Sequence, residues 1–334
     1  MKNKLSLLVF LLTLPLLSIS QENDSSPNGE PHFTAFWNYH YDFTENTTQV
    51  SAFEIARVYL GYKYTFNDAF SAKITYDIGK NSAGSSHTAF LKIAQLDWKV
   101  NSNFKLSMGM IGGKMFKDQE KIWGYRYVYK TFQDEHKFGS SADLGVNGEF
   151  KLSNNLTFNA FILNGEGYKN IQDDDGYMKV GGNLIYEFKN GLSAKLYYDS
   201  EPGDDNFNVT NVGYFVGYKK NKSRFGFEYN KINNAESYKN PSLDSNLSGY
   251  SFYGSQKLGD KDEVYLRYDK LESNTLVGNS SPWNLDKDGA LLIFGYQTKV
   301  RNGFKLSFNY RNYNYSNDSK NNKSMFFINA EIKI

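Results

Sequence analysis

The sequence predicts an all-β protein, a transmembrane antiparallel β-barrel of about 16 strands with short periplasmic turns and long extracellular loops. The first observation is an alternation of apolar and polar side chains, in which Phe304, Leu306 and Phe308 alternate with Lys305 and Ser307. Successive side chains of a strand point to opposite faces, so one face of the sheet is apolar and the other polar. The second observation is that tight polar turns alternate with long polar loops along the chain. A soluble sandwich or a secreted β-solenoid is the alternative, but neither has a reason to sort its loops in this way.

The first residues have the pattern of an export signal. Residues 1–20 carry Lys2 and Lys4 before an apolar run that ends in small residues, as in a secretory signal peptide. That run is too short to cross a bilayer as a helix. Residues 21–31 are polar and contain prolines and a glycine, so we expect a flexible periplasmic leader there and the barrel over residues 32–334.

Composition excludes several classes of protein and site. The chain has no cysteine, which excludes disulfides, thiolate metal sites and a cysteine nucleophile. It has 26 Tyr and 26 Phe but only 6 Pro, a balance that suits strands. Lys2 and Lys4 account for the whole net charge of +2, so the chain after residue 20 has no net formal charge. Bulk charge therefore gives no information about nucleic acid or an anionic surface. We expect no nucleic-acid partner.

The alternating segments place the strands in order. We expect strands at residues 32–43, 50–66, 69–79, 88–101, 103–114, 138–151, 155–164, 177–189, 191–199, 208–220, 223–232, 246–258, 262–271, 287–300, 303–314 and 323–334.

The connections between these segments have two lengths. Each even strand meets the next odd strand through a tight turn rich in Asn, Asp or Gly, such as Asn190-Gly191 and Asn302-Gly303. The other connections are long and hydrophilic, for example residues 233–245 and 272–286. This alternation is what an even barrel with both termini on the periplasmic side requires.

Aromatic residues gather beside the short turns. Phe66 and Phe70 bracket one turn, and Trp98 and Phe104 bracket the next. High β-propensity alone would place aromatics anywhere along a strand. Their clustering beside turns predicts an aromatic girdle at a membrane interface.

The polar faces of the expected strands identify the wall of the lumen. Its charged pore-lining candidates are Arg57, Lys63, Lys73, Asp77, Asp97, Lys99, Lys105, Lys179, Lys195, Arg224, Arg267, Lys305 and Arg311. Charges of both signs in a water-filled lumen stay solvated and pair across strands, so they form either a hydrated wall or a selectivity surface. Selectivity is set where a pore is narrowest.

Residues 115–137 form the longest expected loop and are the candidate constriction. The loop is rich in aromatic residues, and its candidate pore-facing cations are Lys117, Lys121, Arg126 and Lys130. Folding the loop into the barrel would bury its rings and direct these cations toward the lumen. The alternative is a flap that lies over the outer rim.

Signals for metal binding and catalysis are weak. His32, His40, His87 and His136 are scattered, and no two of them have a metal-ligand spacing. The sequence has no GxSxG motif and no phosphate-binding glycine loop. We expect no metal, no cofactor and no enzymatic activity.

Several segments resemble the phosphate-selective porin O and P family of outer-membrane channels. The similar segments are EIARVYLGY at residues 54–62, KITYDIG at 73–79, AQLDWK at 94–99, MGM at 108–110, DLGV at 143–146 and NGEGY at 164–168. The resemblance covers roughly residues 50–190. It implies a sixteen-stranded pore, often trimeric, with inward loops and basic residues that guide anions, and Arg57 lies in the matching strand. The chain has no dense ladder of arginines or lysines, so phosphate selectivity is not expected.

The expected function is an outer-membrane porin for passive diffusion of small hydrophilic solutes or ions, with a mild preference for anions. We expect export through a cleavable signal peptide to the outer membrane of a Gram-negative bacterium. Expected partners are outer-membrane lipids, lipopolysaccharide, small hydrophilic solutes and further copies of the chain in a homotrimer. One alternative is a barrel plugged by residues 115–137 that serves as a surface adhesin or binding protein. Another is a barrel enzyme with a catalytic cluster near the outer rim.

Overall fold

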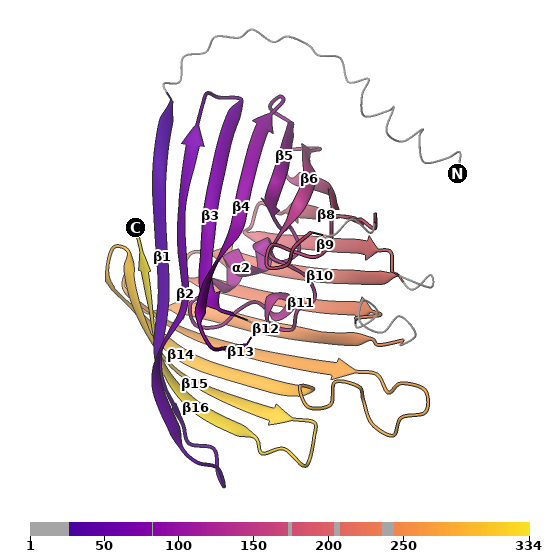
Figure 1. The fold of residues 1–334 in the computed structure, drawn as a ribbon. Helices are drawn as coiled ribbons and strands as arrows, with labels where there is room; N and C mark the ends of the chain where they lie inside the picture. Colours follow the sequence, from indigo (N-terminus) through magenta and orange to yellow (C-terminus); the bar gives the residue numbers. More distant parts are fainter. Residues whose placement is uncertain (1–26, 82, 173–175, 204–207, 236–243) are drawn as a thin grey trace.

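The strands form one closed antiparallel barrel, in which β1 pairs with β16 (Figure 1). The computed structural model describes residues 27–81, 83–172, 176–203, 208–235 and 244–334, and the sixteen strands all lie within them. The strands are β1 (Asn28–Asp42), β2 (Val50–Thr65), β3 (Phe70–Lys80), β4 (His87–Lys99), β5 (Phe104–Gly112), β6 (Ala142–Lys151), β7 (Leu156–Leu163), β8 (Lys179–Glu187), β9 (Leu192–Glu201), β10 (Val209–Lys220), β11 (Ser223–Asn233), β12 (Leu247–Lys257), β13 (Asp262–Ser273), β14 (Gly289–Arg301), β15 (Phe304–Tyr315) and β16 (Lys323–Lys333). The predicted fold class is confirmed.

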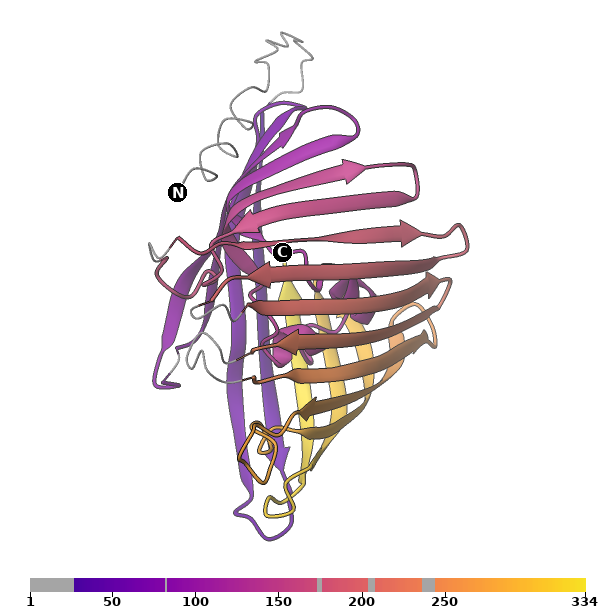
Figure 2. The ribbon, with the colours of Figure 1, turned by 90° about the vertical axis from the view of Figure 1, so that its right-hand side faces the viewer.

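The two ends of the barrel differ in the length of their connections. Short turns such as residues 221–222 and 302–303 join even strands to the next odd strands. The opposite end carries the longer connections, including residues 113–141 between β5 and β6 and residues 274–288 between β13 and β14. The predicted sorting of short and long connections is confirmed, and Figure 2 shows the tilted strands that run between the two ends.

The first strand begins earlier than the sequence predicts. Residues 28–31, expected in the leader, belong to β1 and pair with β2, from Asn28 opposite Thr65 to Pro31 opposite Tyr62. Pairing between β1 and β16 begins only at Thr34, so Pro31 lies where β1 has one neighbour. A proline lacks a backbone N–H and is tolerated where a strand has only one neighbour. The prolines therefore predict a flexible leader at positions where a strand still forms.

The predicted alternation of faces is inverted relative to a soluble protein. In β13, Leu266 on the outer face is 44% exposed, whereas Arg267 and Asp269 on the inner face are 0% and 2% exposed. Large apolar side chains are exposed along the outside of the other strands as well, including Phe294 and Phe227. An apolar outer surface around a charged interior fits a barrel surrounded by lipid.

Aromatic rings lie side by side next to the short turns. Phe70 stacks on Trp98 with ring centroids 5.7 Å apart, and Phe104 stacks on Phe150 at 4.7 Å. Phe158 continues this row, 6.1 Å from Phe150. The rings form a band at the short-turn end, as the predicted girdle requires.

Two helices lie in the connection between β5 and β6. They are α2 (Lys117–Trp123) and α3 (Phe132–Glu135), and Figure 1 shows α2 within the ring of strands. In the part of the chain that the structure describes, no helix is long and apolar enough to cross a membrane.

Candidate pore and its inward-folded loop

Residues 113–141, here called the inner loop, fold into the barrel. The loop starts as a continuation of the sheet, because the Gly113 N–H donates to the Ser141 carbonyl at 2.8 Å. The helix α2 then ends at Gly124, whose φ of 73° is the left-handed geometry common at helix C-termini. The Gly124 N–H donates to the Glu120 carbonyl and closes the last turn.

One side of the inner loop packs on the wall through aromatic rings. Trp123 is 1% exposed, and its ring centroid lies 5.4 Å from Tyr253 and 5.7 Å from Tyr265. Gly226 and Gly295 make room for these two tyrosines, since a Cβ at either glycine would lie within 2.5 Å of ring atoms. The rings therefore lie flat on the inner wall and form a surface for the loop.

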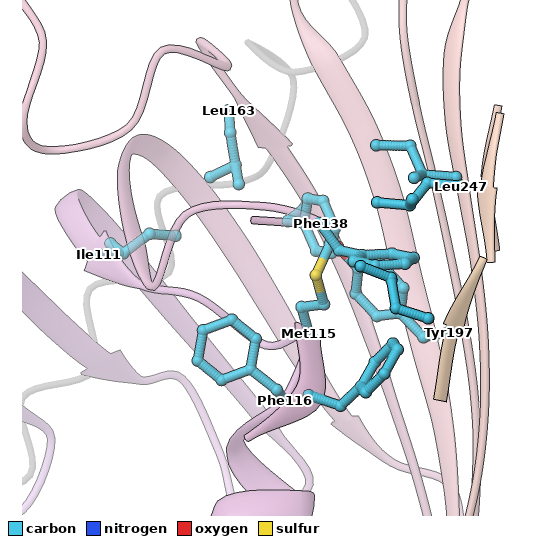
Figure 3. Close-up of a cluster of buried hydrophobic side chains, with 11 residues drawn as sticks. Ile111, Met115, Phe116, Phe138, Leu163, Tyr197 and Leu247 are labelled. Atoms are coloured by element: carbon cyan, nitrogen blue, oxygen red, sulfur yellow. The ribbon is translucent and has the colours of Figure 1, made fainter. Parts of the chain in front are cut away.

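A second cluster fixes both ends of the inner loop. Met115, Phe116, Phe132 and Phe138 are all buried, and Figure 3 shows Met115 directed toward Phe138. The wall contributes apolar residues of β5, β7, β9, β11, β12 and β13 to this cluster, which are Ile111, Phe161, Leu163, Tyr197, Ile232, Leu247 and Leu271. The sequence predicts a strand from residue 138, but β6 begins only at Ala142 because Phe138 is buried in the loop cluster.

Wall cations bind the backbone of the inner loop. The Lys195 ammonium donates to the carbonyls of Lys114 at 2.7 Å and Met115 at 2.8 Å. Arg267 donates to the Lys130 carbonyl at 2.6 Å, and Arg311 donates to the Val128 carbonyl at 2.8 Å. Carbonyls without sheet or helix partners need donors when buried, and these side chains supply them.

On its other side the inner loop borders an open cavity of about 1040 Å³. The opposite wall comes from β1 to β8 and β16. The charged side chains that the loop contributes are Lys114, Lys117, Asp118, Glu120, Lys121, Arg126 and Asp134. Nine Lys or Arg side chains and eight carboxylates line this space. It is therefore a polar, highly charged cavity that the loop narrows from one side.

Ion pairs hold the charged side chains around the cavity. Arg126 lies 3.3 Å from Glu120 and 3.1 Å from Asp134. Burial alone would lower the pKa of the Arg126 guanidinium, but Tyr59 and these two carboxylates raise it above its ordinary value. Arg126 thus stays charged in the cavity wall. Lys73, by contrast, has no carboxylate within ion-pair distance in the described chain.

The predicted pore-lining and constriction-loop residues divide into two groups. Those that border the cavity are Lys63, Lys73, Asp97, Lys105, Lys117, Lys121 and Arg126. The others are Arg57, Asp77, Lys99, Lys130, Lys179, Lys195, Arg224, Arg267, Lys305 and Arg311, which do not border it.

Most of the second group have partners instead of open space. Ion pairs join Arg57 to Asp77, Lys179 to Glu201, Arg224 to Glu263, Lys305 to Glu331 and Lys130 to Glu135. Lys195, Arg267 and Arg311 bind the inner loop. The sequence leaves open a hydrated wall with paired charges or a selectivity surface, and these ion pairs fit the first. The inner loop covers the wall residues that bind it, Lys195 on β9, Arg267 on β13 and Arg311 on β15.

Lys92 is a cavity residue that the alternation does not predict. Thr75 pairs with Ile93 while the next residue, Tyr76, pairs with Leu91, so Lys92 is the extra residue of a β-bulge. Both Lys92 and Ile93 therefore line the cavity. A period of two cannot reveal such a residue, because the bulge interrupts the period.

The described residues contain no group of three or more His, Asp or Glu side chains arranged to hold a metal ion.

The comparison with protein families matches residues 33–112 to phosphate-selective porin O and P. This confirms the resemblance expected from the sequence, and the match ends where β5 ends. No curated protein matches the sequence.

Solved outer-membrane barrels share the fold. OmpF of Salmonella typhi in complex with daunomycin has a TM-score of 0.67 at 12% identity, over 92% of this chain and 97% of that one. An anion-selective porin from Comamonas acidovorans has a TM-score of 0.64 at 10% identity, over 92% and 100%. OmpT of Vibrio cholerae, an outer-membrane protein, has a TM-score of 0.62 at 15% identity, over 93% and 99%. At these identities the similarity is one of fold.

Proposed function

We propose that the protein is an outer-membrane channel for passive diffusion of small hydrophilic solutes or ions, and that it catalyses no reaction. The observation that carries this proposal is the charged cavity of about 1040 Å³ inside a barrel whose outer face is apolar. Such a wall keeps permeating solutes hydrated, while the outer face is solvated by lipid. The family match and the similarity to solved porins support the same function.

A mild preference for anions is part of the proposal. The cavity has one more cation than carboxylate, and among the described residues no carboxylate lies within ion-pair distance of Lys73. The inner loop places Lys117 and Lys121 on the opposite side of the same space. A cation without an ion-pair partner beside the path of permeating ions favours entry of anions.

Export through residues 1–20 and residence in the outer membrane belong to the same proposal. The lipid-facing surface implies contact with phospholipid and lipopolysaccharide. One of the solved OmpT structures of Vibrio cholerae is a trimer form, which supports a homotrimer for this chain.

The experiment that tests this function is single-channel recording of the folded protein in a planar bilayer, followed by the reversal potential in a salt gradient. We expect stepwise conductance and a reversal potential whose sign reports a small excess of anion current. No conductance from folded protein would contradict the channel and leave the barrel intact.

A plugged barrel that serves as an adhesin or binding protein is the second candidate. The observation in its favour is that the inner loop is firmly packed inside the barrel, where Trp123 and Phe132 are 1% and 0% exposed. The same recording separates the two functions, because a permanent plug would abolish conductance.

A further inference from the structure

The connection between β7 and β8 also reaches into the barrel. Tyr168 in this connection is only 9% exposed, and its N–H donates to the Ala142 carbonyl at 3.1 Å. Its phenol donates to Asp77 Oδ2 at 2.5 Å. Asp77 lies on β3, which β4, β5 and β6 separate from β7 in the barrel. The contact therefore joins two parts of the wall that are not neighbours.

Asp77 is the centre of a charged cluster. Arg57 Nε lies 3.1 Å from Asp77 Oδ1, and Lys92 Nζ lies 3.7 Å from Oδ2. The Lys92 ammonium also lies 5.0 Å from the centroid of the Tyr59 ring and 5.2 Å from that of Tyr168. Two cations and two rings thus surround one carboxylate that is 0% exposed.

The phenol of Tyr168 is suited to hold this carboxylate. Burial raises the pKa of Tyr168, and the charge of Asp77 raises it further, so the hydroxyl keeps its proton and donates. Phe90 meets the Tyr168 ring edge-on at 6.3 Å between centroids, and this contact fixes the orientation of the ring.

The open cavity ends at the level of this cluster. On β2 the cavity wall ends at Tyr59, and on β3 it ends at Thr75. The next inward side chains toward the long-connection end are Arg57 and Asp77, and neither lines the cavity. Tyr168 is not itself among the side chains that line the cavity, but it contacts Asp77 at that end through its hydroxyl.

We propose that Tyr168 determines the size of the solutes that the pore admits, by capping the outer end of the cavity while Asp77 holds its hydroxyl. This inference rests on the proposed channel function and extends it to a second narrow point, separate from the inner loop. When the ring moves away, Arg57 and Asp77 join Lys92 in the wall of the passage.

The test compares two substitutions in the same connection. Tyr168→Ala removes the ring and should raise single-channel conductance and let larger sugars enter proteoliposomes in a swelling assay. Ile171→Ala is the matched control, because Ile171 is 94% exposed and makes no such contact. It should behave as the wild-type protein.

A third variant separates the hydrogen bond from the ring. Tyr168→Phe keeps the ring and removes the donor to a buried carboxylate. A hydrogen bond to a charged group contributes about 1.5–3 kcal/mol. The ratio of closed channels, in which the ring lies against Asp77, to open channels, in which it has moved away, should therefore fall about tenfold or more. Gating records of the Phe variant should show correspondingly more open time, at a conductance no larger than that of the Ala variant.

An access measurement makes the result independent of conductance. The chain has no cysteine, so an introduced cysteine is the single labelling site. Ser71 lines the cavity near its short-turn end, and a reagent that enters from the long connections must pass Tyr168 to reach it. A Ser71→Cys protein labelled on intact cells with a bulky hydrophilic maleimide should react severalfold faster when Tyr168→Ala is added. Heat-modifiable migration on gels establishes that each variant is folded.

The outcomes distinguish the cap from the channel. Conduction by the wild-type protein, with conductance and labelling rate unchanged by Tyr168→Ala, would overturn the role of Tyr168 and leave the channel. Absence of conduction and labelling in the wild-type protein and in Tyr168→Ala alike would overturn the channel itself. Conduction by both proteins, with a larger conductance and faster labelling in Tyr168→Ala, would support the cap.

Discussion

Lys195 illustrates how a single wall residue can hold a long loop. Its side chain is 1% exposed, and its ammonium contacts the Lys114 and Met115 carbonyls and lies 3.0 Å from Asp118 Oδ2. Burial alone would raise the pKa of Asp118, but the Lys195 ammonium lowers it below its ordinary value, so the carboxylate remains charged. A buried ammonium is stable only when its donors are used, and here a carboxylate and two carbonyls use them.

Replacing this residue should therefore free the start of the inner loop. In Lys195→Met, Asp118 and two buried carbonyls lose their donor, and breaking a buried ion pair typically costs about 3–5 kcal/mol. We expect faster amide exchange over α2, measured by hydrogen–deuterium exchange in detergent, and noisier channel openings.

The control for Lys195 is another lysine that contacts the same carboxylate. Lys121 Nζ lies 3.3 Å from Asp118 Oδ1, but the Lys121 side chain is 75% exposed. An exposed ion pair contributes about 0–1 kcal/mol, so Lys121→Met should leave exchange over α2 almost unchanged. Equal effects of the two substitutions would contradict the anchoring role of Lys195.

At the scale of elements, the inner loop is where sequence and structure differ most. The period of two identifies all sixteen strands because each strand has an apolar and a polar face. It also places Lys195 and Arg267 on the inner face. It does not reveal whether water or another segment faces them, because that depends on where the inner loop goes.

The second narrow point was also hidden in the sequence. Tyr168 is one of two aromatic residues in a polar connection, and its partner Asp77 is 91 positions away. Lys92, the third member of the cluster, is displaced by a bulge. Contacts of this kind are set by the closure of the barrel, so no local pattern reports them.

The packing of the inner loop around α3 should weaken in acid because His136 is buried there. His136 follows α3, and its ring lies 4.6 Å from that of Phe132 between centroids. Burial lowers the pKa of His136 below its ordinary value of 6.5. Three nearby carboxylates, those of Asp269, Glu135 and Asp288, favour the cation, whereas Arg267 disfavours it. Neutral imidazole is therefore the form that packs.

The sign of the pH dependence follows from proton binding. Between the lowered pKa and 6.5 the released loop binds more protons than the packed loop. Stability of the packing is thus fully present above 6.5 and decreases as the pH falls through the lowered pKa. Amide exchange at residues 132–138, corrected for intrinsic rates, should rise on acidification in the wild-type protein. In His136→Gln this rise should be absent, and a rise of the same size there would exclude His136 as its source.

At the scale of the whole molecule, the inner loop divides the lumen into two unequal parts. The loop packs mainly on rings and apolar residues of β9–β15, with further contacts to β1, β5 and β7, and on the ion pair of Lys195 with Asp118. Against β1–β8 it leaves the charged cavity. Solutes would then pass along one side of the barrel, where the net charge of a few residues decides ion preference.

Reversing two of those residues should reverse the preference. Lys73 on β3 and Lys117 on α2 face the cavity from its two sides. Changing both to Glu turns an excess of one cation into an excess of three carboxylates among the lining side chains. Because the Debye length is about 10 Å at 0.1 M salt, charges on either wall still act on an ion that passes between them. In Lys73→Glu/Lys117→Glu the reversal potential in a gradient around that concentration should change sign and report a preference for cations.

The matched control is Lys261→Glu, in the short turn between β12 and β13 and outside the cavity, which should leave the reversal potential unchanged. An equal shift in both proteins would mean that ion preference is set by the charge of the entrance and not by the cavity beside the inner loop.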